Sequence, residues 1–300
     1  MKIQQPKFLQ RGDIVAIVTT ARKIDKEDLQ PAIELLEGWG LNVVIGKTIG
    51  LEDNQFGGTD TQRTADFQKA LDDDSIKAIW CARGGYGTVR IIDRLDFTKF
   101  LQHTKWVIGF SDVTALHSHI HNMGIETLHA IMPITVKGNT PQALTSLQKD
   151  LFGLKNSYKI PSVGINKLGA ATGVLVGGNL SMLYSLLGSV SAIETKGKIL
   201  FIEDLDEYLY HVDRMMMNLK RNGYFDNLAG LIVGGMTKMN DNEIPFGKNA
   251  EEIILDVLAE YSFPIVFNFP AGHVSDNRSL HFGRKVTLAV TATEVQVDFD

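Results

Sequence analysis

The chain has very few cysteines, no long hydrophobic run and no concentration of basic residues. Cys81 is the single cysteine, so no internal disulfide can form, which agrees with a reducing compartment. No apolar stretch approaches the ~20 residues that span a bilayer, and residues 1–7 contain no apolar core of signal-peptide length. The net charge is −5 and Lys and Arg form no extended run, which argues against nucleic acid or a membrane surface as a partner. We therefore expect a cytoplasmic protein.

The first part of the chain alternates strand and helix patterns. Three hundred residues, 44% apolar and 22% charged, suffice for about two domains with buried cores. The expected strands are Ile14–Val18, Val43–Ile45, Ile76–Cys81, Val107–Phe110 and Thr127–Ile131, and the expected helices are Lys26–Trp39, Asp60–Asp72 and Thr88–Leu95. This alternation predicts a parallel α/β domain of the flavodoxin or Rossmann type over residues 1–140. Ligands of such sheets bind beyond the carboxyl ends of the strands.

The pattern changes after residue 140. Residues 141–168 are polar and predict a connector that is helical and then irregular. Beyond it the expected strands are Gly173–Val176, Lys198–Glu203, Gly230–Val233, Ile265–Phe267, Lys285–Val290 and Glu294–Phe299, with an amphipathic helix over Tyr208–Arg221. We therefore expect a smaller, β-rich α+β domain over residues 169–300.

Ser111 lies where the apolar run ending at Phe110 gives way to a helix that begins at Asp112. A sharp strand-to-helix turn projects the side chain at its apex out of the sheet and places the next backbone N–H at a helix N-terminus. Such a serine can act as a nucleophile. The usual G-x-S-x-G motif has a second glycine where this chain has Val113, and Ser111 can equally be interpreted as a helix N-cap.

A glycine-rich loop, Arg83–Thr88, follows one predicted strand. Three glycines among four positions, at Gly84, Gly85 and Gly87, allow backbone N–H groups to approach an anion closely. The loop lacks the Gly-Lys-Ser/Thr of a P-loop and the full G-x-G-x-x-G spacing. A plain turn needs only one glycine, so the pattern favours a functional loop.

Two further segments place titratable side chains after strands. Glu203, Asp204, Asp206 and Glu207 precede the predicted helix, where acidic residues commonly serve as caps and dipole partners. Glu203 closes the strand and is the one most expected to face a cleft. His273 lies in a loop immediately after another predicted strand, and loops on rigid strands are where catalytic side chains collect.

Two other features have simpler interpretations. His117, His119 and His121 resemble a metal tract, but the Glu of H-E-x-x-H is absent and zinc usually needs a third protein ligand. We expect these histidines to have packing or surface roles, with no metal bound. Cys81 precedes the glycine loop and is expected to be a buried structural thiol.

Several segments occur in a defined order along nearly the whole chain. They are Ala82–Gly87, Gly109–Asp112, Gly177–Leu180, Glu203–Asp204 with Asp213–Met215, and Gly272–His273. Together they resemble the serine-type LD-carboxypeptidases, a family that also includes the microcin C self-immunity peptidases. Several motifs in the right order are far more specific than any one of them.

The resemblance implies a Ser-His-Glu triad on Ser111, His273 and Glu203, with the nucleophile in the N-terminal domain and the other two residues in the C-terminal domain. It selects Glu203 over Glu207 because the family's glutamate begins the Glu-Asp pair. The implied task is removal of the terminal D-alanine from murein tetrapeptides during cell-wall recycling. It also implies a cytoplasmic homodimer that uses no metal or other cofactor.

The chemistry of these residue types fits that assignment. His273, oriented by Glu203, would take the proton of Ser111 and return it to the departing D-amino acid. The backbone N–H of Asp112, with one from Gly84 or Gly85, would hold the oxyanion. Arg83 is a candidate for binding the terminal carboxylate, by proximity to this loop.

Other functions remain open at this level. Within the same family, a nucleotide-peptide of the microcin type is an alternative substrate, and it requires an aromatic platform for the base. A non-catalytic ligand-binding α/β protein is a second alternative, which predicts no particular relation among Ser111, Glu203 and His273. The glycine loop is also faintly similar to that of NAD kinases, but Tyr86 stands where their aspartate would be.

Overall fold

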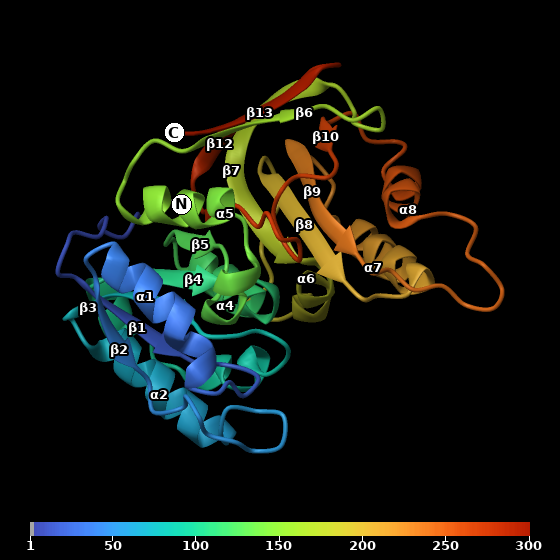
Figure 1. The fold of residues 1–300 in the computed structure, drawn as a ribbon. Coiled ribbons are helices and arrows are strands. Elements are labelled where there is room, and N and C mark those ends of the chain that lie inside the picture. The colour runs from blue at the N-terminus through green and yellow to red at the C-terminus, as the bar shows by residue number, and fades with distance from the viewer. Residues whose placement is uncertain (1–2) are drawn as a thin grey trace.

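The computed structural model describes residues 3–300, and Figure 1 shows two sheets side by side. The first sheet has six strands in the order β11-β5-β4-β3-β1-β2. Their bounds are β1 Ile14–Val18, β2 Asn42–Ile45, β3 Ile76–Cys81, β4 Trp106–Gly109, β5 Thr127–His129 and β11 Leu280–Phe282. Strands β1 to β5 are parallel, and β11 runs antiparallel to β5.

Helices cover this first sheet. They are α1 Gln30–Gly38, α2 Asp60–Asp72, α3 Thr98–Gln102, α4 Thr114–Asn122 and α5 Pro141–Leu151. Local sequence explains their starts: Thr59 and Gln62 form a capping box at α2, and Thr140 caps α5, which has proline at its first position. Because helices cover both faces, the central strands are nearly continuous apolar runs, and all four residues of β4 are buried.

The second sheet has seven strands in the order β10-β9-β8-β7-β12-β13-β6. Their bounds are β6 Ser157–Pro161, β7 Gly169–Asn179, β8 Ile199–Leu205, β9 Gly230–Thr237, β10 Ile265–Val266, β12 Lys285–Val290 and β13 Glu294–Phe299. Strands β7 to β10 are parallel and the others antiparallel. The expected fold class, a parallel α/β domain followed by a β-rich α+β domain, is confirmed, and the second sheet is mixed.

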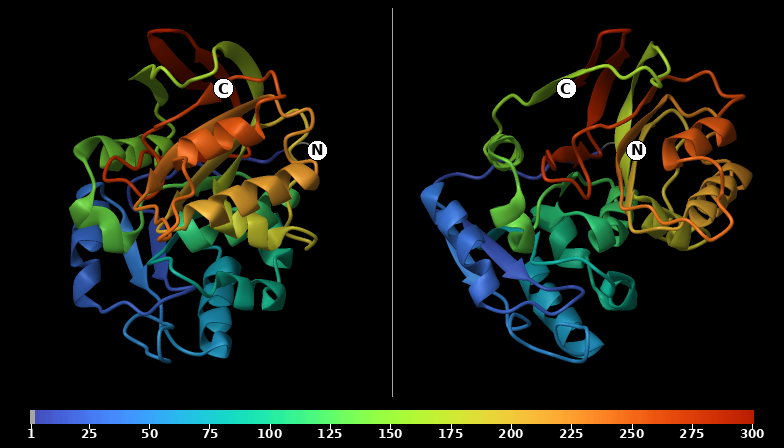
Figure 2. Two further views of the ribbon diagram at one scale, coloured as in Figure 1. Left: turned by 90° about the vertical axis from the view of Figure 1, so that its right-hand side faces the viewer. Right: turned by 45° about the vertical axis from the view of Figure 1, so that its right-hand side comes forward.

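Three helices accompany the second sheet: α6 Leu180–Leu186, α7 Leu209–Arg221 and α8 Ala250–Val257. Figure 2 shows α7 and α8 lying together on one face of it. Their apolar side chains pack in one buried cluster with Leu200, Ile202 and Leu231 of the sheet. Within residues 3–300, no helix combines the length and the apolar character that a membrane span needs.

The structure differs from the expected elements in several places, and helices α3, α6 and α8 are among the elements that were not expected. The predicted helix Thr88–Leu95 is two 3-10 turns, because the segment bends tightly to bury Ile91 and Ile92. The predicted connector contains strand β6, which pairs with β13. Strand β11 was not expected at all, and it joins the first sheet although the chain around it belongs to the second.

A buried polar network holds β11 in place. His281 Nε2 lies 3.0 Å from Asp150 of α5, and the hydroxyl of Tyr158 donates to the carbonyl of Ser279 at 2.6 Å. Arg284 forms an ion pair with Glu126 at 2.6 Å, at the start of β5. These contacts join residues that are far apart in the sequence. They fix the position of the segment around β11 on the first sheet.

Helix α4 and strand β7 bring the two sheets into contact. The N–H of Asn179 donates to Oγ1 of Thr114 at 3.0 Å, and a side chain at Gly178 would collide with Thr114. A glycine at this position therefore allows the backbone of β7 to approach α4. The nearby ends of β4 and β8 carry Ser111 and Glu203 toward the same region.

Candidate active site

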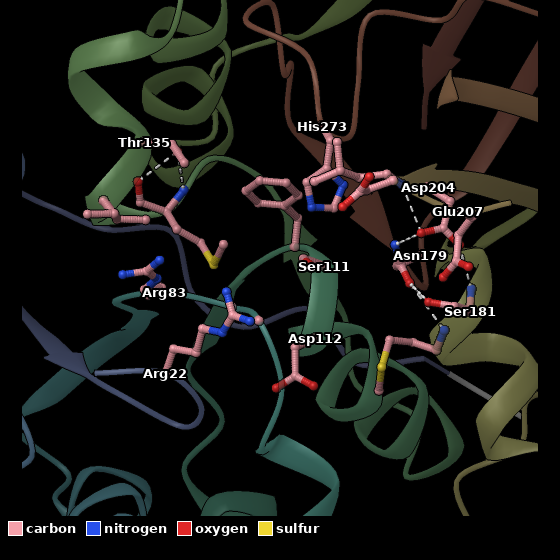
Figure 3. A pocket seen from close by; sticks show the side chains of 18 residues that line it. Arg22, Arg83, Ser111, Asp112, Thr135, Asn179, Ser181, Asp204, Glu207 and His273 are labelled. Carbon is pink, nitrogen blue, oxygen red and sulfur yellow. Dashed lines mark hydrogen bonds between the residues drawn. The ribbon is translucent and has the colours of Figure 1, made fainter. Parts of the chain in front are cut away.

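A cleft of about 510 Å³ lies between the two sheets and collects most of the predicted site residues (Figure 3). Those from the first half of the chain are Arg83, Gly84, Gly85, Ser111 and Asp112, and His273 comes from the second half. Glu203 lies behind His273, fully buried, and does not itself line the cleft. The cleft is at the carboxyl ends of β3 and β4, as expected for a parallel sheet.

Ser111 has a strained backbone. Its φ is +62°, in the left-handed region that costs a non-glycine residue roughly 1–2 kcal/mol. The helical turn that begins here has Phe110 as its N-cap, with no side-chain cap, so the interpretation of Ser111 as a helix N-cap is wrong. Strain of this kind persists only where the surroundings enforce it, and it is characteristic of functional sites.

Gly109 and Val113 explain how the turn forms without a second glycine. Gly109 has φ +159°, and a Cβ placed on it would lie 2.8 Å from Cγ2 of Val113. Val113 is fully buried and fills the space above Gly109. Because Gly109 has no side chain, the larger Val113 fits at the position where the usual motif has its second glycine.

The glycine loop lies directly beside Ser111. A Cβ on Gly84 would be 3.3 Å from the Ser111 hydroxyl oxygen. Within residues 3–300, the N–H groups of Gly84 and Gly85 donate to no backbone carbonyl. Free donors next to a serine hydroxyl are what an oxyanion site requires.

His273 and Glu203 form a close pair. Nδ1 of His273 is 2.6 Å from Oε2 of Glu203, and the backbone N–H of His273 donates to the same oxygen at 3.1 Å. With Nδ1 donating to the carboxylate, Nε2 is left free to accept a proton. Glu207, the other candidate, pairs instead with His211 at 2.6 Å.

Burial and neighbouring charges shift the pKa values of His273 and of Asp204 beside it. Burial disfavours the imidazolium of His273, but the charge of Glu203 and its hydrogen bond outweigh burial and raise the pKa of His273 above its ordinary value. Next to Glu203, burial and the Glu203 charge raise the pKa of Asp204 to about 7, although N–H donors of Leu205, Asn179 and Ser181 oppose the shift. Asp204 therefore changes charge near neutral pH, and His273 keeps its proton to a higher pH than an ordinary histidine does.

The raised pKa of His273 gives a pH prediction. If His273 is the general base, it must be neutral to act, so kcat/KM should rise with pH through a midpoint above 6.5, the ordinary histidine value. Glu203→Gln removes the charge that raises the pKa, so the midpoint should move to lower pH while kcat falls. A pH profile of kcat/KM for both proteins checks this. A midpoint that does not move in the variant would contradict the pairing.

Sequence reasoning missed Arg22 and assigned no role to Asn179 or Asp204, all of which line the cleft. The side chain of Arg22 lies over Gly85, where an added Cβ would come within 2.5 Å of Cδ of Arg22. Arg22 follows β1, whose carboxyl end is at the same sheet edge as those of β3 and β4, and that placement is the signal that could have found it.

The histidine tract makes three separate contacts. His117 lies 2.8 Å from Oγ1 of Thr127, His119 lies 2.9 Å from Oγ of Ser191, and His121 Nε2 accepts from Lys198 at 2.8 Å. The last two contacts join α4 to the second half of the chain. Among residues 3–300 no group of three or more His, Cys, Asp and Glu side chains is arranged to hold a metal ion.

Cys81 has the properties of a structural residue. Its side chain is buried, and burial raises the pKa of the thiol to about 12. A thiol that stays protonated is a poor nucleophile.

Comparisons with known proteins agree with this fold. The family models for the LD-carboxypeptidase N-terminal and C-terminal domains match residues 15–130 and 172–288. The chain is 36% identical to the probable murein peptide carboxypeptidase of Bacillus subtilis (strain 168), over 95% of this chain and 91% of that protein. It is 27% identical to the murein tetrapeptide carboxypeptidase of Pseudomonas aeruginosa, over 91% and 92%.

Solved structures give the same result. The crystal structure of muramoyltetrapeptide carboxypeptidase from Oxalobacter formigenes matches with a TM-score of 0.87 and 26% identity, covering 95% of this chain and 98% of that one. The two-sheet fold and these matches define a peptidase, a class of hydrolase. More particularly, the chain belongs to the LD-carboxypeptidase family.

Proposed function

We propose that the protein is a serine carboxypeptidase that removes the terminal D-alanine from murein tetrapeptides, using Ser111, His273 and Glu203. The observation that carries the proposal is the meeting of three features at one cleft: a strained serine, free glycine N–H groups beside it, and a histidine paired with a buried glutamate. A non-catalytic binding protein has no need of this combination. The relatives' names supply the substrate class.

The proposed mechanism assigns each step to one of these groups. Nε2 of His273 takes the proton of Ser111 while the serine oxygen attacks the carbonyl carbon of the L,D-peptide bond. The N–H of Asp112, with that of Gly84 or Gly85, stabilises the oxyanion, and each donor contributes ~3 kcal/mol to lowering the barrier. The imidazolium then protonates the departing D-alanine, and water hydrolyses the ester with His273 again as base. Glu203 keeps the imidazole in the required tautomer.

The charges of the cleft supply an orientation for the substrate. In Figure 3, Arg22 and Arg83 lie on one side of Ser111, and Asp204 and Glu207 lie on the other. A carboxypeptidase substrate has a free carboxylate on the leaving-group side, which an arginine binds well through two hydrogen bonds. The leaving D-alanine therefore belongs on the arginine side of the cleft.

Substitution of the arginines tests that orientation. Arg22→Ala or Arg83→Ala should lower kcat/KM by roughly 10- to 100-fold, the worth of a hydrogen bond to a charged group. The loss should appear mainly in KM for the tetrapeptide. A tetrapeptide whose terminal carboxylate is amidated is the control, because wild type and variant should then be equally slow. An equal loss with both substrates would place the terminal carboxylate elsewhere.

The scarcity of aromatic side chains in the cleft favours the tetrapeptide over a nucleotide-peptide as substrate. Apart from His273, Phe110 is the one aromatic side chain that lines the cleft in the described part of the chain. Its ring packs against that of His273, with centroids 4.9 Å apart. A nucleobase needs an open aromatic face on which to stack, and this ring is already in contact with the catalytic imidazole.

Product analysis tests the proposal. Purified protein is incubated with murein tetrapeptide, and separately with tripeptide, and the products are identified by mass spectrometry with and without a chelator. We expect the tetrapeptide to lose one D-alanine, the tripeptide to stay intact, and the chelator to have no effect. An unchanged tetrapeptide, or cleavage at another bond, would refute the assigned activity.

A further inference from the structure

One peptide group beneath the cleft, between Gly87 and Thr88, is held at both of its polar ends. Nη1 of Arg63 donates to the carbonyl of Gly87 at 3.0 Å, and the N–H of Thr88 donates to Oδ2 of Asp112 at 2.8 Å. Arg63 and Asp112 are both buried, with 0% and 1% of their surface exposed. Charged groups so deeply buried are costly unless they are paired and hydrogen-bonded, so their position calls for an explanation.

The glycine loop has little freedom at this point. Gly87 has φ +148°, a value that L-residues rarely adopt. A Cβ there would lie 2.8 Å from Nη1 of Arg63 and 3.0 Å from Cα of Ala21. With its carbonyl and the following N–H both engaged, this peptide cannot rotate without breaking two buried hydrogen bonds. The end of the glycine loop is therefore fixed.

Arg63 is itself held by several loops. Its guanidinium donates to the carbonyls of Thr20 and Gly58 and forms an ion pair with Asp60 at 2.5 Å. The loops after β1 and before α2 thus converge on the same side chain that holds Gly87. The guanidinium is planar and holds several N–H donors in fixed directions, like a fork, and the single ammonium group of lysine cannot reproduce this geometry.

Asp112 connects the loops that Arg63 holds to the proposed nucleophile, Ser111. It follows Ser111 directly, so its backbone belongs to the strained turn while its carboxylate binds the glycine loop. Burial raises the pKa of Asp112, whereas the hydrogen bonds from Thr88 and the charge of Arg63 act in the opposite direction. An ionised Asp112 carboxylate would oppose a nearby oxyanion, and both the burial that raises its pKa and the positive charge of Arg63 reduce that opposition.

We propose that Asp112 and Arg63 are positioning residues, which clamp the Gly87–Thr88 peptide and so hold the N–H groups of Gly84 and Gly85 at the place where the oxyanion forms. This inference rests on the proposed serine mechanism. It assigns the Asp112 carboxylate a role separate from that of its backbone N–H. It also explains why Arg63 and Asp112 are buried under the cleft.

The test compares Asp112→Ala with Asp112→Asn. Alanine cannot accept the Thr88 N–H, so kcat should fall by about 100-fold, the effect of losing one oxyanion donor, with KM within about 3-fold of wild type. Asparagine keeps an oxygen that can accept this N–H, so kcat should recover to within about 10-fold of wild type. Arg63→Lys keeps the charge but loses the fork, and a kcat loss between these two is expected.

Asp66→Ala is the matched control. Asp66 is also a buried aspartate, in helix α2, and its Oδ2 accepts from the N–H of Thr48 at 2.8 Å, but it does not line the cleft. This variant should lose thermal stability comparably and keep kcat within about 3-fold.

The outcomes separate the inference from the proposed function. Equal kcat in the Asp112→Ala and Asp66→Ala variants, or no recovery with Asp112→Asn, would overturn the clamp even if the wild type cleaves the tetrapeptide. If the wild type does not cleave it, the same variants are compared by their rates of fluorophosphonate labelling at Ser111. If Asp112→Ala does not fold, the inference is tested by the kcat values of Asp112→Asn and Arg63→Lys. A wild-type kcat in Arg63→Lys would then overturn the inference.

Discussion

Replacing Ser111 with alanine is expected to reduce kcat by roughly 10⁴-fold or more while the protein remains folded. The side chain removed is small, partly exposed in the cleft and makes no cap, so the packing around it is little affected. His273→Ala should cause a comparable loss, and Glu203→Ala a smaller one, because in the proposed mechanism Glu203 orients the imidazole and transfers no proton. Steady-state kinetics with tetrapeptide, together with circular dichroism to confirm folding, measures these effects.

The three substitutions are also expected to be non-additive. A triad acts as a unit, so the triple variant should be little slower than Ser111→Ala alone. If Ser111→Ala keeps near-wild-type kcat, Ser111 is not the nucleophile. If the losses multiply across the variants, the three residues act independently and the triad assignment fails.

Gly272→Ala should also lower kcat strongly. Gly272 has φ +97°, and a Cβ on it would lie 2.6 Å from Oε2 of Glu203, the oxygen that accepts from His273. The added methyl group must displace the carboxylate, so kcat should fall by about 100-fold through misplacement of the base. The midpoint of the pH profile should also shift, since the Glu203 charge would no longer sit at Nδ1.

Gly247→Ala is the control for backbone strain. Gly247 has a comparable φ of +84°, but a Cβ there meets no atom within 4 Å. Both alanine variants pay a similar conformational cost, on the order of 1 kcal/mol, whereas only Gly272→Ala disturbs Glu203. A loss of kcat in Gly247→Ala as large as that in Gly272→Ala would attribute the effect to strain and would contradict the proposed collision.

The sequence predicted those parts of the fold whose signals are local. Strands β1, β3 and β4 are apolar runs buried on both faces, and such runs are recognisable without any tertiary information. Strand β11 has only three residues, one of them His281, and it forms because a partner strand and the buried Asp150 are supplied from far along the chain. No local pattern carries that information.

The candidate site divides in the same way. Ser111, Glu203 and His273 stand at strand ends or in loops within motifs of a known family, so they could be selected from the sequence. Arg22 comes from a loop with no motif, and it reaches the cleft only because β1 lies beside β3. The contact of the Asp112 carboxylate with Thr88 joins residues of two different loops, and only the folded structure shows it.

The most direct test of the central claim is to identify the residue that a fluorophosphonate modifies. The wild-type protein is labelled to completion, digested and analysed by mass spectrometry, in parallel with His273→Ala and with wild type saturated by tetrapeptide. Because the proposed role of His273 is to activate the serine, we predict one label per chain on Ser111, slowed by the tetrapeptide and nearly absent in His273→Ala. A label on another residue, or full tetrapeptide hydrolysis by completely labelled protein, would contradict the assignment of Ser111 as the nucleophile.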